Sequence, residues 1–201
     1  MAPLLPRLVV ASGNAGKLRE LAALLGELAT ELVPQSALGV AAVAETETSL
    51  RGNALLKARH AARATGCAAL ADDSGLEVDA LGGAPGVYSA RYAGEGAGDA
   101  DNNLKLLAAL AGVPPPRHAR YRAVLALVRR ADDPAPLIAE GVWDGEIATA
   151  ARGSGGFGYD PLFVPAGLGR TVAQLAPAEK NRVSHRARAL AALLAAWREQ
   201  P

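Results

Sequence analysis

The chain has little cysteine and few aromatic residues. Cys67 is the single cysteine in 201 residues, which excludes an intrachain disulfide framework. Because Cys67 lies in an apolar stretch, we interpret it as a small buried hydrophobic residue. Aromatic residues make up 4% of the chain and hydrophobic residues 50%, so alanine and leucine must fill most of the core. The length suits one domain, or one domain with two lobes.

The chain also has almost no net charge and no long apolar run. A formal charge of +1 does not support a surface that coats a polyanion, so we expect no nucleic-acid partner. No run approaches the ~18 apolar residues of a membrane span. The residues from Met1 to Ser12 lack the layout of a signal peptide. We therefore expect a cytoplasmic enzyme with no membrane partner. Without repeats or a separable linker, residues 1–201 are expected to form a single two-lobed domain.

Two adjacent carboxylates, Asp72 and Asp73, follow an apolar strand predicted over Cys67–Ala71. Carboxylates at a strand end attract Mg²⁺, which prefers oxygen ligands. Neighbours in an extended chain point to opposite faces, so we expect one of the pair to serve a site and the other to cap a backbone group. Asp, Ser and Gly are also ordinary turn residues, which is the competing interpretation. The long glycine-rich stretch from Gly82 to Gly94 favours function, because long loops inside compact domains usually have one.

A short glycine-containing loop joins the first predicted strand to a helix. The strand is Leu8–Ala11, the loop is Ser12 to Lys17, and apolar residues from Leu18 to Leu28 mark one helix face. This arrangement aims backbone N–H groups at an anion, and Lys17 adds a positive charge. The loop is not a Walker A motif, because Leu18 replaces Ser or Thr after the lysine. A plain tight turn is the alternative.

The next segment combines acidic residues with a helix. After a strand and loop predicted over Val33–Val43, a helix is expected from an N-cap at Thr48 or Ser49 to Thr65, with Gly66 beyond its end. Glu45 and Glu47 precede it, either as metal ligands or simply as favourable charges at the helix N-terminus. Asn53 and Lys57 lie one turn apart, so both could face a site. Arg59 and Arg63 are predicted on a solvated face.

The middle of the chain is predicted to form a helix and two strands, without a metal site. A helix is predicted over Asp99–Ala111, and Gly112 with the following prolines ends it. Strands over Tyr121–Val128 and Leu137–Ile147 are expected to form an antiparallel hairpin. Asp132 and Asp133, flanked by proline and alanine, are predicted to form its turn and not a metal site.

A glycine-rich motif from Gly153 to Pro161 follows, and then a short strand, Leu162–Val164. Its four glycines allow the backbone to wrap a flat ligand. Phe157 offers a stacking face, which contributes ~1–3 kcal/mol per base in nucleic-acid complexes. Asp160 can accept hydrogen bonds from ring N–H groups. A glycine-rich hairpin with core aromatics is the alternative.

Cationic side chains gather near the start of the last predicted helix. They are Lys180, His185 and Arg186, with Ser184 among them, and the helix continues through Leu190 to Trp197. Cations prefer the other end of a helix, so their place here favours a ligand-facing role.

Taken together, these segments resemble the signatures of the ITPase/HAM1 family, the non-canonical purine nucleoside triphosphate pyrophosphatases. The matching motifs are Ser12–Asn14–Lys17, Glu45 with Asn53-Ala54, Asp72 to Gly94, Gly-Phe-Gly-Tyr-Asp-Pro at 156–161, and Lys-Asn with Ser-His-Arg at 180–186. They span nearly the whole chain. The resemblance implies an α/β fold shared with Maf-like and anticodon-binding proteins. That fold has a long twisted mixed β-sheet flanked by helices, with two lobes around a central nucleotide cleft. It also implies a homodimer.

The resemblance also implies roles for individual residues. Asp73 would be the catalytic proton acceptor, and Glu45 and Asp73 would bind Mg²⁺, with Mn²⁺ as the alternative metal. The implied substrate-binding residues are Ser12, Gly13, Asn14, Ala15, Gly16, Lys17, Ser74, Phe157, Gly158, Tyr159, Asp160, Lys180, His185 and Arg186, with Asn53, Lys57 and Arg91 as further candidates. One departure is Gly52, where the family often has a glutamate before Asn-Ala, so any role of that glutamate is absent here.

The implied reaction is Mg²⁺-dependent hydrolysis of dITP, ITP, XTP and dXTP to the monophosphate and pyrophosphate, which cleanses the nucleotide pool. Inosine and xanthosine carry a 6-keto acceptor where adenine carries a 6-amino donor. Donors from Lys180, His185 or Arg186 would pair with the keto group and face a donor in adenine. Unpaired buried polar groups cost ~1–3 kcal/mol each, so such a pocket can discriminate.

Three other functions compete with this interpretation. A Maf-like nucleotide pyrophosphatase would share the chemistry but prefer other bases, and the Ser-His-Arg and Gly-Phe-Gly-Tyr-Asp motifs oppose it. A non-catalytic nucleotide-binding regulator would not need Glu45 and Asp73 together. A P-loop kinase is disfavoured by Leu18 after Lys17.

Overall fold

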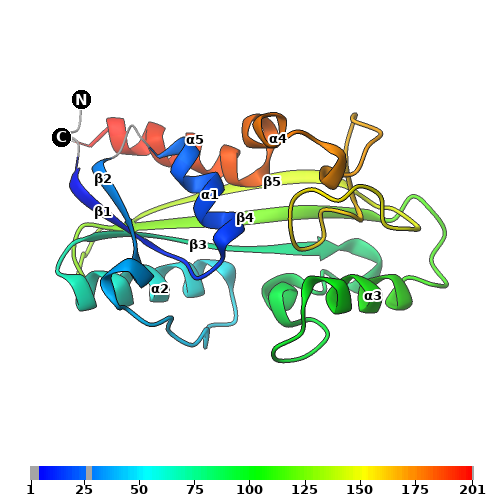
Figure 1. Ribbon diagram of the computed structural model, residues 1–201, viewed down its shortest axis with the longest axis horizontal. Coiled ribbons are helices and arrows are strands. Elements are labelled where there is room, and N and C mark those ends of the chain that lie inside the picture. The colour runs from blue at the N-terminus through cyan, green and yellow to red at the C-terminus, as the bar shows by residue number, and fades with distance from the viewer. Residues whose placement is uncertain (1–4, 26–28, 201) are drawn as a thin grey trace. The chain divides into compact units, whose positions relative to one another are not determined.

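The computed structural model describes residues 5–25 and 29–200, which form a mixed α/β architecture around a six-stranded sheet (Figure 1). The strand order is β2-β1-β3-β4-β5-β6. Strand β1 pairs in parallel with β2 and β3, whereas β5 and β6 are antiparallel. The strands are β1 (Leu5–Ala11), β2 (Ala29–Pro34), β3 (Ala68–Val78), β4 (His118–Val128), β5 (Leu137–Ile147) and β6 (Phe163–Pro165). The predicted mixed sheet with flanking helices is therefore confirmed.

Five α-helices accompany the sheet in the described residues. They are α1 (Ala15–Leu24), α2 (Leu50–Thr65), α3 (Asp99–Ala109), α4 (Pro177–Val183) and α5 (His185–Arg198). Short 3₁₀ helices lie at Gln35–Leu38, Asp79–Leu81, Gly86–Arg91 and Val172–Gln174. None of the helices in residues 5–25 and 29–200 is long and apolar enough to cross a membrane.

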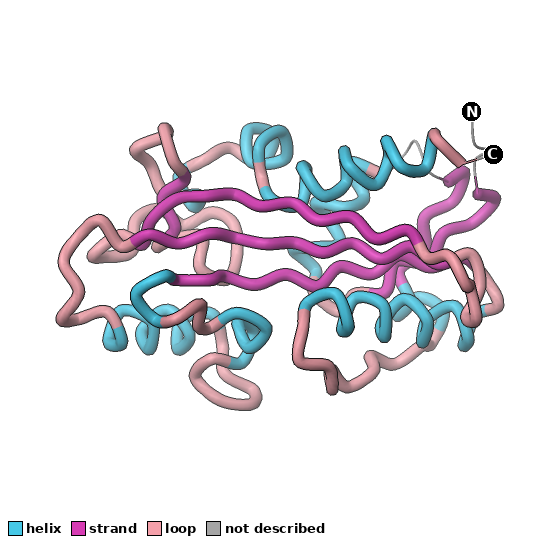
Figure 2. Tube along the Cα trace, turned by 180° about the vertical axis from the view of Figure 1, so that it is seen from behind, coloured by secondary structure: helices cyan, strands magenta, loops and turns pink. Residues whose placement is uncertain are grey.

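The chain folds into two compact units. The first consists of Met1–Asp73, Ala123–Gly141 and Arg186–Pro201, and the second of Ser74–Arg122 and Val142–His185. Strands β3, β4 and β5 have 11 residues each and contribute to both units. Figure 2 shows these three strands as the longest elements of the sheet.

The core of the first unit is built from alternating strand residues and two helices. Helices α1 and α5 lie on one face of the strands and α2 on the other (Figure 1). The largest cluster contains Leu8, Val10, Leu21, Leu25, Leu70, Leu125, Leu127, Leu190, Leu193 and Trp197. The opposite face receives the alanines of α2, of which Ala54, Ala58 and Ala61 are fully buried. Because both faces are covered, the segments Leu8–Ala11 of β1 and Ala68–Ala71 of β3 are continuously apolar, as is typical of parallel strands.

The second unit has its own core, in which half of the aromatic side chains of the chain lie. Tyr121, Trp143, Tyr159 and Phe163 pack together with the aliphatic residues Leu76, Val78, Leu106, Leu110, Ile147, Leu162, Val172 and Leu175. Rings of Tyr121 and Phe163 are 4.6 Å apart at an angle of 59°. The few aromatics of the chain are thus concentrated where the glycine-rich motif must be anchored.

Several predicted elements are confirmed. Ser49 is the N-cap of α2, where its hydroxyl accepts from Gly52 N at 3.1 Å, and Gly66 ends the helix at a φ of 69°. Strand β5 has the predicted bounds, and it is adjacent to β4 in the sheet, as a hairpin requires. Asp133 caps the intervening turn, because its carboxylate accepts from the backbone N–H groups of Arg129 and Ala135.

The acidic motif is not a turn, and the strand before it was predicted too short. Strand β3 continues through Asp72, Asp73, Ser74 and Gly75 to Val78. Cys67 precedes β3 and is only partly buried, so its interpretation as a buried strand residue was wrong. Pairing with neighbouring strands extends β3 through residues whose local propensity favours a turn.

Other boundaries also differ. The second strand ends at Pro34 and does not begin at Val33, and a 3₁₀ helix follows it. Helix α1 begins at Ala15, and the predicted last apolar position, Leu28, lies outside the described residues. Two helices, α4 and α5, replace the single predicted C-terminal helix, because Ser184 between them has extended backbone angles. Lys180 therefore lies in the last turn of α4, where a cation is favourable.

Candidate active site

The segment from Ser12 to Lys17 lies at the carboxyl end of β1, and it is shorter as a loop than predicted, because Ala15 to Lys17 form the start of α1. Residue Ala11 of β1 is in register with Ala71 of β3, so this loop begins beside Asp72. Asn14 is the N-cap of α1, and its side-chain oxygen accepts from Lys17 N at 3.0 Å. The Ser12 hydroxyl accepts from Asn14 N at 3.2 Å. A helix start at the carboxyl end of a parallel strand is a favourable position for an anion.

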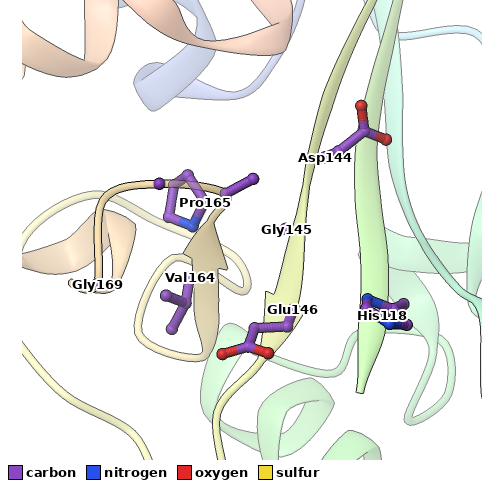
Figure 3. Close-up of a pocket in the computed structure, with 9 residues that line it drawn as sticks. His118, Asp144, Gly145, Glu146, Val164, Pro165 and Gly169 are labelled. Carbon is purple, nitrogen blue, oxygen red and sulfur yellow. The ribbon is translucent and has the colours of Figure 1, made fainter. Parts of the chain in front are cut away.

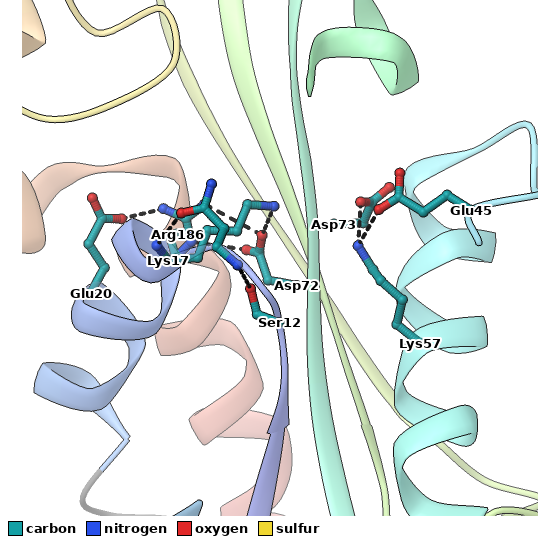
Figure 4. A network of polar contacts seen from close by, with 9 residues as sticks. Ser12, Lys17, Glu20, Glu45, Lys57, Asp72, Asp73 and Arg186 are labelled. Carbon is teal, nitrogen blue, oxygen red and sulfur yellow. Dashed lines mark hydrogen bonds and ion pairs between the residues drawn. The ribbon is translucent and has the colours of Figure 1, made fainter. Parts of the chain in front are cut away.

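The two adjacent carboxylates face opposite sides of β3 (Figure 4). This confirms that only one of them can serve each face, as the strand period requires. Asp72 points towards α1 and α5, whereas Asp73 points towards α2. Both side chains are buried, with 1% and 5% exposure. Each therefore needs its own compensating cation.

Asp72 forms buried ion pairs with side chains of α1 and α5. Its carboxylate lies 2.5 Å from Lys17 Nζ and accepts from Arg186 Nε at 3.0 Å. Burial alone would raise the pKa of Asp72, but Arg186 and Lys17 lower it far below its usual range. Arg186 is itself 1% exposed and also donates to Glu20 of α1. The ionised network explains the placement of Arg186 at the start of α5: two carboxylates compensate its charge there.

Asp73 belongs to a second network on the opposite face. Lys57 Nζ of α2 lies 2.6 Å from Asp73 Oδ1 and 2.9 Å from Glu45 Oε1 (Figure 4). Burial would lower the pKa of Lys57, yet the two carboxylates raise it overall, so the amine is charged. The pKa of Asp73 is raised, chiefly by burial, although Lys57 opposes this. The geometry brings together the two predicted metal ligands around one cation.

These two carboxylates fit a hard divalent cation. Asp73 Oδ2 is buried and accepts no hydrogen bond from the residues that the structure describes. Within that part of the chain, no group of three or more His, Cys, Asp or Glu side chains is arranged to hold a metal. Glu45 and Asp73 would therefore supply two ligands, with water and phosphate oxygens completing the shell, as is usual for Mg²⁺.

Asn53 forms a hydrogen bond with the backbone of the segment that carries Glu45. Its side-chain oxygen accepts from Glu47 N at 3.0 Å, and the residue is fully buried. Asn53 and Lys57 lie on the same side of α2, as predicted from their spacing. Arg59 is less solvated than predicted, because it donates to Asp133 O at 3.3 Å.

The glycine-rich motif of the second unit is organised around Asp160. This buried carboxylate accepts from Phe157 N at 2.9 Å and from Lys180 Nζ at 2.6 Å. Lys180 Nζ also lies 4.5 Å from the centre of the Phe157 ring. A Cβ on Gly156 would collide with the Asp160 carboxylate, so only glycine fits there. Phe157, Asp160 and Lys180, all predicted to bind the base, are brought together.

His185 and Tyr159 also belong to this cluster, through contacts with Tyr121 and Ser89. The His185 ring stacks on Tyr121 at 4.6 Å and 11°. Tyr121 donates to Asp160 Oδ1 at 3.3 Å, and burial followed by the Asp160 charge raises its pKa well above the usual value. Tyr159 is 3% exposed and donates to Ser89 O at 2.8 Å, so its phenol is anchored in the protein.

The remaining predicted residues are placed as follows. Arg186 donates to Asp72 and Glu20 in the first unit, whereas Lys180 and His185 belong to the second. Ser74 follows Asp73 within β3 and is half-buried. The guanidinium of Arg91 lies 5.3 Å from the Tyr88 ring centre and 3.4 Å from Glu95.

A separate cavity of about 350 Å³ lies in the second unit, beside β5 and β6 (Figure 3). Its polar lining includes His118, Asp144 and Glu146. None of the residues predicted to bind nucleotide lines it. The two carboxylates would repel a triphosphate, so we do not assign the substrate to this cavity.

Sequence reasoning missed the structural partners of the predicted residues. Glu20 was not singled out, although it is three residues from Lys17 on the same helix and could have been suspected from that spacing. Asp72 was given a minor role, and Ser89 none. Ser89 accepts from Leu76 N at 2.9 Å through its hydroxyl, a contact between distant segments that no local pattern indicates.

The chain is similar to proteins of one family over nearly its whole length. The sequence model of the Ham1 family matches residues 8–196. A protein of Methylococcus capsulatus named dITP/XTP pyrophosphatase is 58% identical over 188 residues, which cover 93% of this chain and 94% of that protein. A Bordetella parapertussis protein of the same name is 60% identical over 195 residues, covering 96% and 91%.

A solved structure is also similar. The structure of a HAM1 protein from Coxiella burnetii superposes with a TM-score of 0.87 at 48% identity, covering 96% of this chain and 99% of that one. The chain therefore belongs to the Ham1 family, and the resemblance inferred from its motifs is confirmed.

Proposed function

We propose that this chain hydrolyses non-canonical purine nucleoside triphosphates, namely dITP, ITP, XTP and dXTP, to the monophosphate and pyrophosphate. The names of its relatives, dITP/XTP pyrophosphatase, bear out the prediction that it is an enzyme of the nucleoside-triphosphate pyrophosphatase class. The observation that carries the proposal is the pair of carboxylates, Glu45 and Asp73, held together by Lys57 in the unit that also contains the Ser12–Lys17 loop.

The proposed metal is Mg²⁺, with Mn²⁺ as the alternative, held by Glu45 and Asp73. Two hard carboxylate oxygens suit either ion. When bound, such an ion neutralises charge that develops on the phosphate oxygens during the reaction. Lys57 already compensates both carboxylates, so it keeps them close together before the ion arrives.

Asp73 is proposed as the proton acceptor for the attacking water. The water oxygen forms a bond to the α-phosphorus while the bond from that phosphorus to the bridging oxygen breaks, and pyrophosphate leaves. Burial raises the pKa of Asp73 in the protein without a bound metal. The raised pKa and the buried Oδ2 atom support this assignment.

The triphosphate is proposed to lie against the Ser12–Lys17 loop and Ser74. The start of α1 offers backbone N–H groups, and Lys17 and Lys57 offer positive charge. Arg91 is proposed as a further phosphate contact. Asp72 and Arg186 would act indirectly, because their ion pairs hold the Lys17 amine in place.

The base is proposed to stack on Phe157, with Lys180 and His185 supplying donors for the 6-keto oxygen. Lys180 is held by Asp160 and lies over the Phe157 ring, so a donor and a stacking face occur side by side. Adenine would place its amino group against these donors, and the resulting unpaired groups would disfavour it. We further propose that the protein acts as a cytoplasmic homodimer that cleanses the nucleotide pool.

The decisive experiment measures released pyrophosphate from dITP, XTP, dGTP and dATP, each with Mg²⁺ and with EDTA. We expect Mg²⁺-dependent release from dITP and XTP, with little from the other two. Equal turnover of all four would discard the base-selecting roles of Lys180 and His185 but retain the metal site. No release from any of them would favour a nucleotide-binding regulator.

A further inference from the structure

Gly158 lies at the centre of the glycine-rich motif, between Phe157 and Tyr159, and two residues of α3 contact it. Asp99 Oδ2 accepts from Gly158 N at 2.6 Å. Asn103 Nδ2 donates to Gly158 O at 2.8 Å. Both contacts are within the second unit. Neither residue belongs to a motif that carried the family resemblance.

These two contacts fix both peptide groups around Gly158. The N–H belongs to the peptide that joins it to Phe157, and the C=O to the peptide that joins it to Tyr159. Gly158 has a φ of +61°, a conformation that few other residues adopt readily, so the local backbone has no strong preference of its own. The turn from Phe157 to Asp160 has one hydrogen bond of its own, from Asp160 N to Phe157 O at 3.2 Å. The contacts from α3 add a support from outside the motif.

Helix α3 is a rigid support for this purpose. Asp99 and Asn103 are one turn apart at its start, and Asn103 Nδ2 also donates to Asp99 O at 2.7 Å. A single amide group thus joins the helix backbone to the loop backbone. Neighbouring Asn102, 3% exposed, ties the same helix to Ala90 and Ala93. These contacts attach the start of α3 to a second segment of the same unit.

Two groups outside α3, Asp160 and Lys180, also contact Phe157. Asp160 accepts from Phe157 N, and Lys180 lies over the ring. The backbone of Phe157 is therefore fixed by Asp160 at its N–H and by the supported Gly158 at its carboxyl side. Without α3, the two hydrogen bonds between Phe157 and Asp160 would remain, but the peptide groups of Gly158 would lose the contacts from Asp99 and Asn103.

We propose that Asp99 and Asn103 are positioning residues that pre-set the Phe157 stacking face for the purine base. They act through Gly158 and do not touch the nucleotide. This inference rests on the proposed function, since it assumes that Phe157 stacks on the base. A face ordered in advance avoids an ordering cost at binding, so the effect belongs to substrate affinity and not to the chemical step.

The kinetic test compares Asp99→Ala and Asn103→Ala with wild type on dITP. Each variant should raise KM about 3- to 10-fold, as expected for one lost hydrogen bond, with kcat within about twofold. Asp99→Asn keeps an acceptor oxygen and should restore most of the affinity. The matched control is Asp101→Ala in the same helix turn. The Asp101 carboxylate accepts from Gly98 N, whereas Gly158 N donates to Asp99. It should leave KM unchanged.

A double-mutant cycle shows whether the effect passes through Phe157. In a Phe157→Ala background, Asn103→Ala should change KM by less than twofold, because the group it positions is missing. Full additivity would overturn the proposal, as would an equal KM rise in Asp101→Ala. A fall in kcat with unchanged KM would also overturn it.

A measurement without substrate separates this inference from the proposed function. Hydrogen exchange of the Gly158 amide, followed by NMR, should be faster in Asp99→Ala and unchanged in Asp101→Ala. Unchanged exchange in Asp99→Ala would overturn the support itself, even if wild type hydrolyses dITP. If wild type releases no pyrophosphate while exchange responds as expected, the proposed function and the kinetic role fail, but the support of the loop by α3 stands.

Discussion

Asp72 and Asp73 differ by one position and occupy opposite environments. One is fixed between Lys17 and Arg186, and the other faces Lys57 and Glu45. Their pKa values shift in opposite directions, downwards for Asp72 and upwards for Asp73. Cations contact the Asp72 carboxylate from two helices, whereas Asp73 Oδ2 accepts no hydrogen bond from the residues that the structure describes. The two residues are therefore expected to respond differently to the same substitution.

Asp73→Asn should abolish turnover while nucleotide binding survives. The amide keeps the shape and an oxygen near Lys57 but cannot accept the proton of water, so kcat should fall by about 10²- to 10⁴-fold. Steady-state pyrophosphate release and dITP titration by calorimetry would measure the two effects. Asp132→Asn, in an exposed turn, serves as the control. Near-wild-type hydrolysis by Asp73→Asn would rule out its catalytic role.

Asp72→Asn should instead lower stability. Removing one partner from a buried ion pair costs about 3–5 kcal/mol. Because the folded-state pKa of Asp72 is depressed, its contribution is present above the unfolded pKa of about 3.9 and is lost as pH falls. The free energies of unfolding of wild type and variant should therefore approach each other progressively as pH falls below about 4. Urea denaturation at several pH values would measure this, and parallel curves would contradict it.

Strand β3 shows at the level of elements how a turn-like sequence becomes extended. Asp-Ser-Gly has low strand propensity, yet β3 continues through it to Val78 because strands β1 and β4 flank it in the sheet. Gly75 within the strand has a specific role. A Cβ there would collide with the backbone oxygen of Gly86 and approach Ser89 Oγ at 3.0 Å. The strand and the 3₁₀ helix at Gly86–Arg91 are packed too closely for any side chain.

Gly75→Ala should therefore destabilise the protein by about 1–3 kcal/mol, since the clashing atom is backbone and cannot move aside. The midpoint of urea denaturation should fall at unchanged slope. Gly112→Ala is the matched control, because a Cβ at Gly112 meets nothing within 4 Å. It should change stability by no more than about 0.5 kcal/mol. Equal effects of both substitutions would show that glycine flexibility, and not close packing, matters at position 75.

At the scale of the whole molecule, the two compact units share three strands. Residues of β3, β4 and β5 enter both hydrophobic cores, with Leu70 and Leu76 of β3 as one example. We propose that residues 1–201 form a single cooperative domain, because neither core can lose its strands without disturbing the other. The two tryptophans allow a direct test: Trp197 is buried in the first core and Trp143 in the second.

In Trp143→Phe the fluorescence reports on the first core, and in Trp197→Phe on the second. We expect each fluorescence transition to coincide with loss of helical circular dichroism in the same variant, as two-state unfolding requires. Comparing the two signals within one variant removes the effect of the substitution on stability. Separate midpoints would show that the units unfold independently.

The sequence by itself determined the family, the positions of the motifs and most helix and strand locations. These follow from information that is local: apolar periodicity, caps such as Ser49, glycines such as Gly66, and short runs whose residue types carry chemistry. The opposite orientation of Asp72 and Asp73 also followed, because it depends only on strand geometry.

Only the tertiary structure decided which charged groups meet. The partners of Asp72 are Lys17 and Arg186, which are 55 and 114 residues away in the chain, and Arg186 also reaches Glu20. It likewise decided that the acidic motif continues a strand, that the last helix divides at Ser184, and that Asp99 and Asn103 support Gly158. The physical reason is the same in each case: these contacts join segments far apart in sequence, and their energies outweigh the local preferences on which a sequence pattern depends.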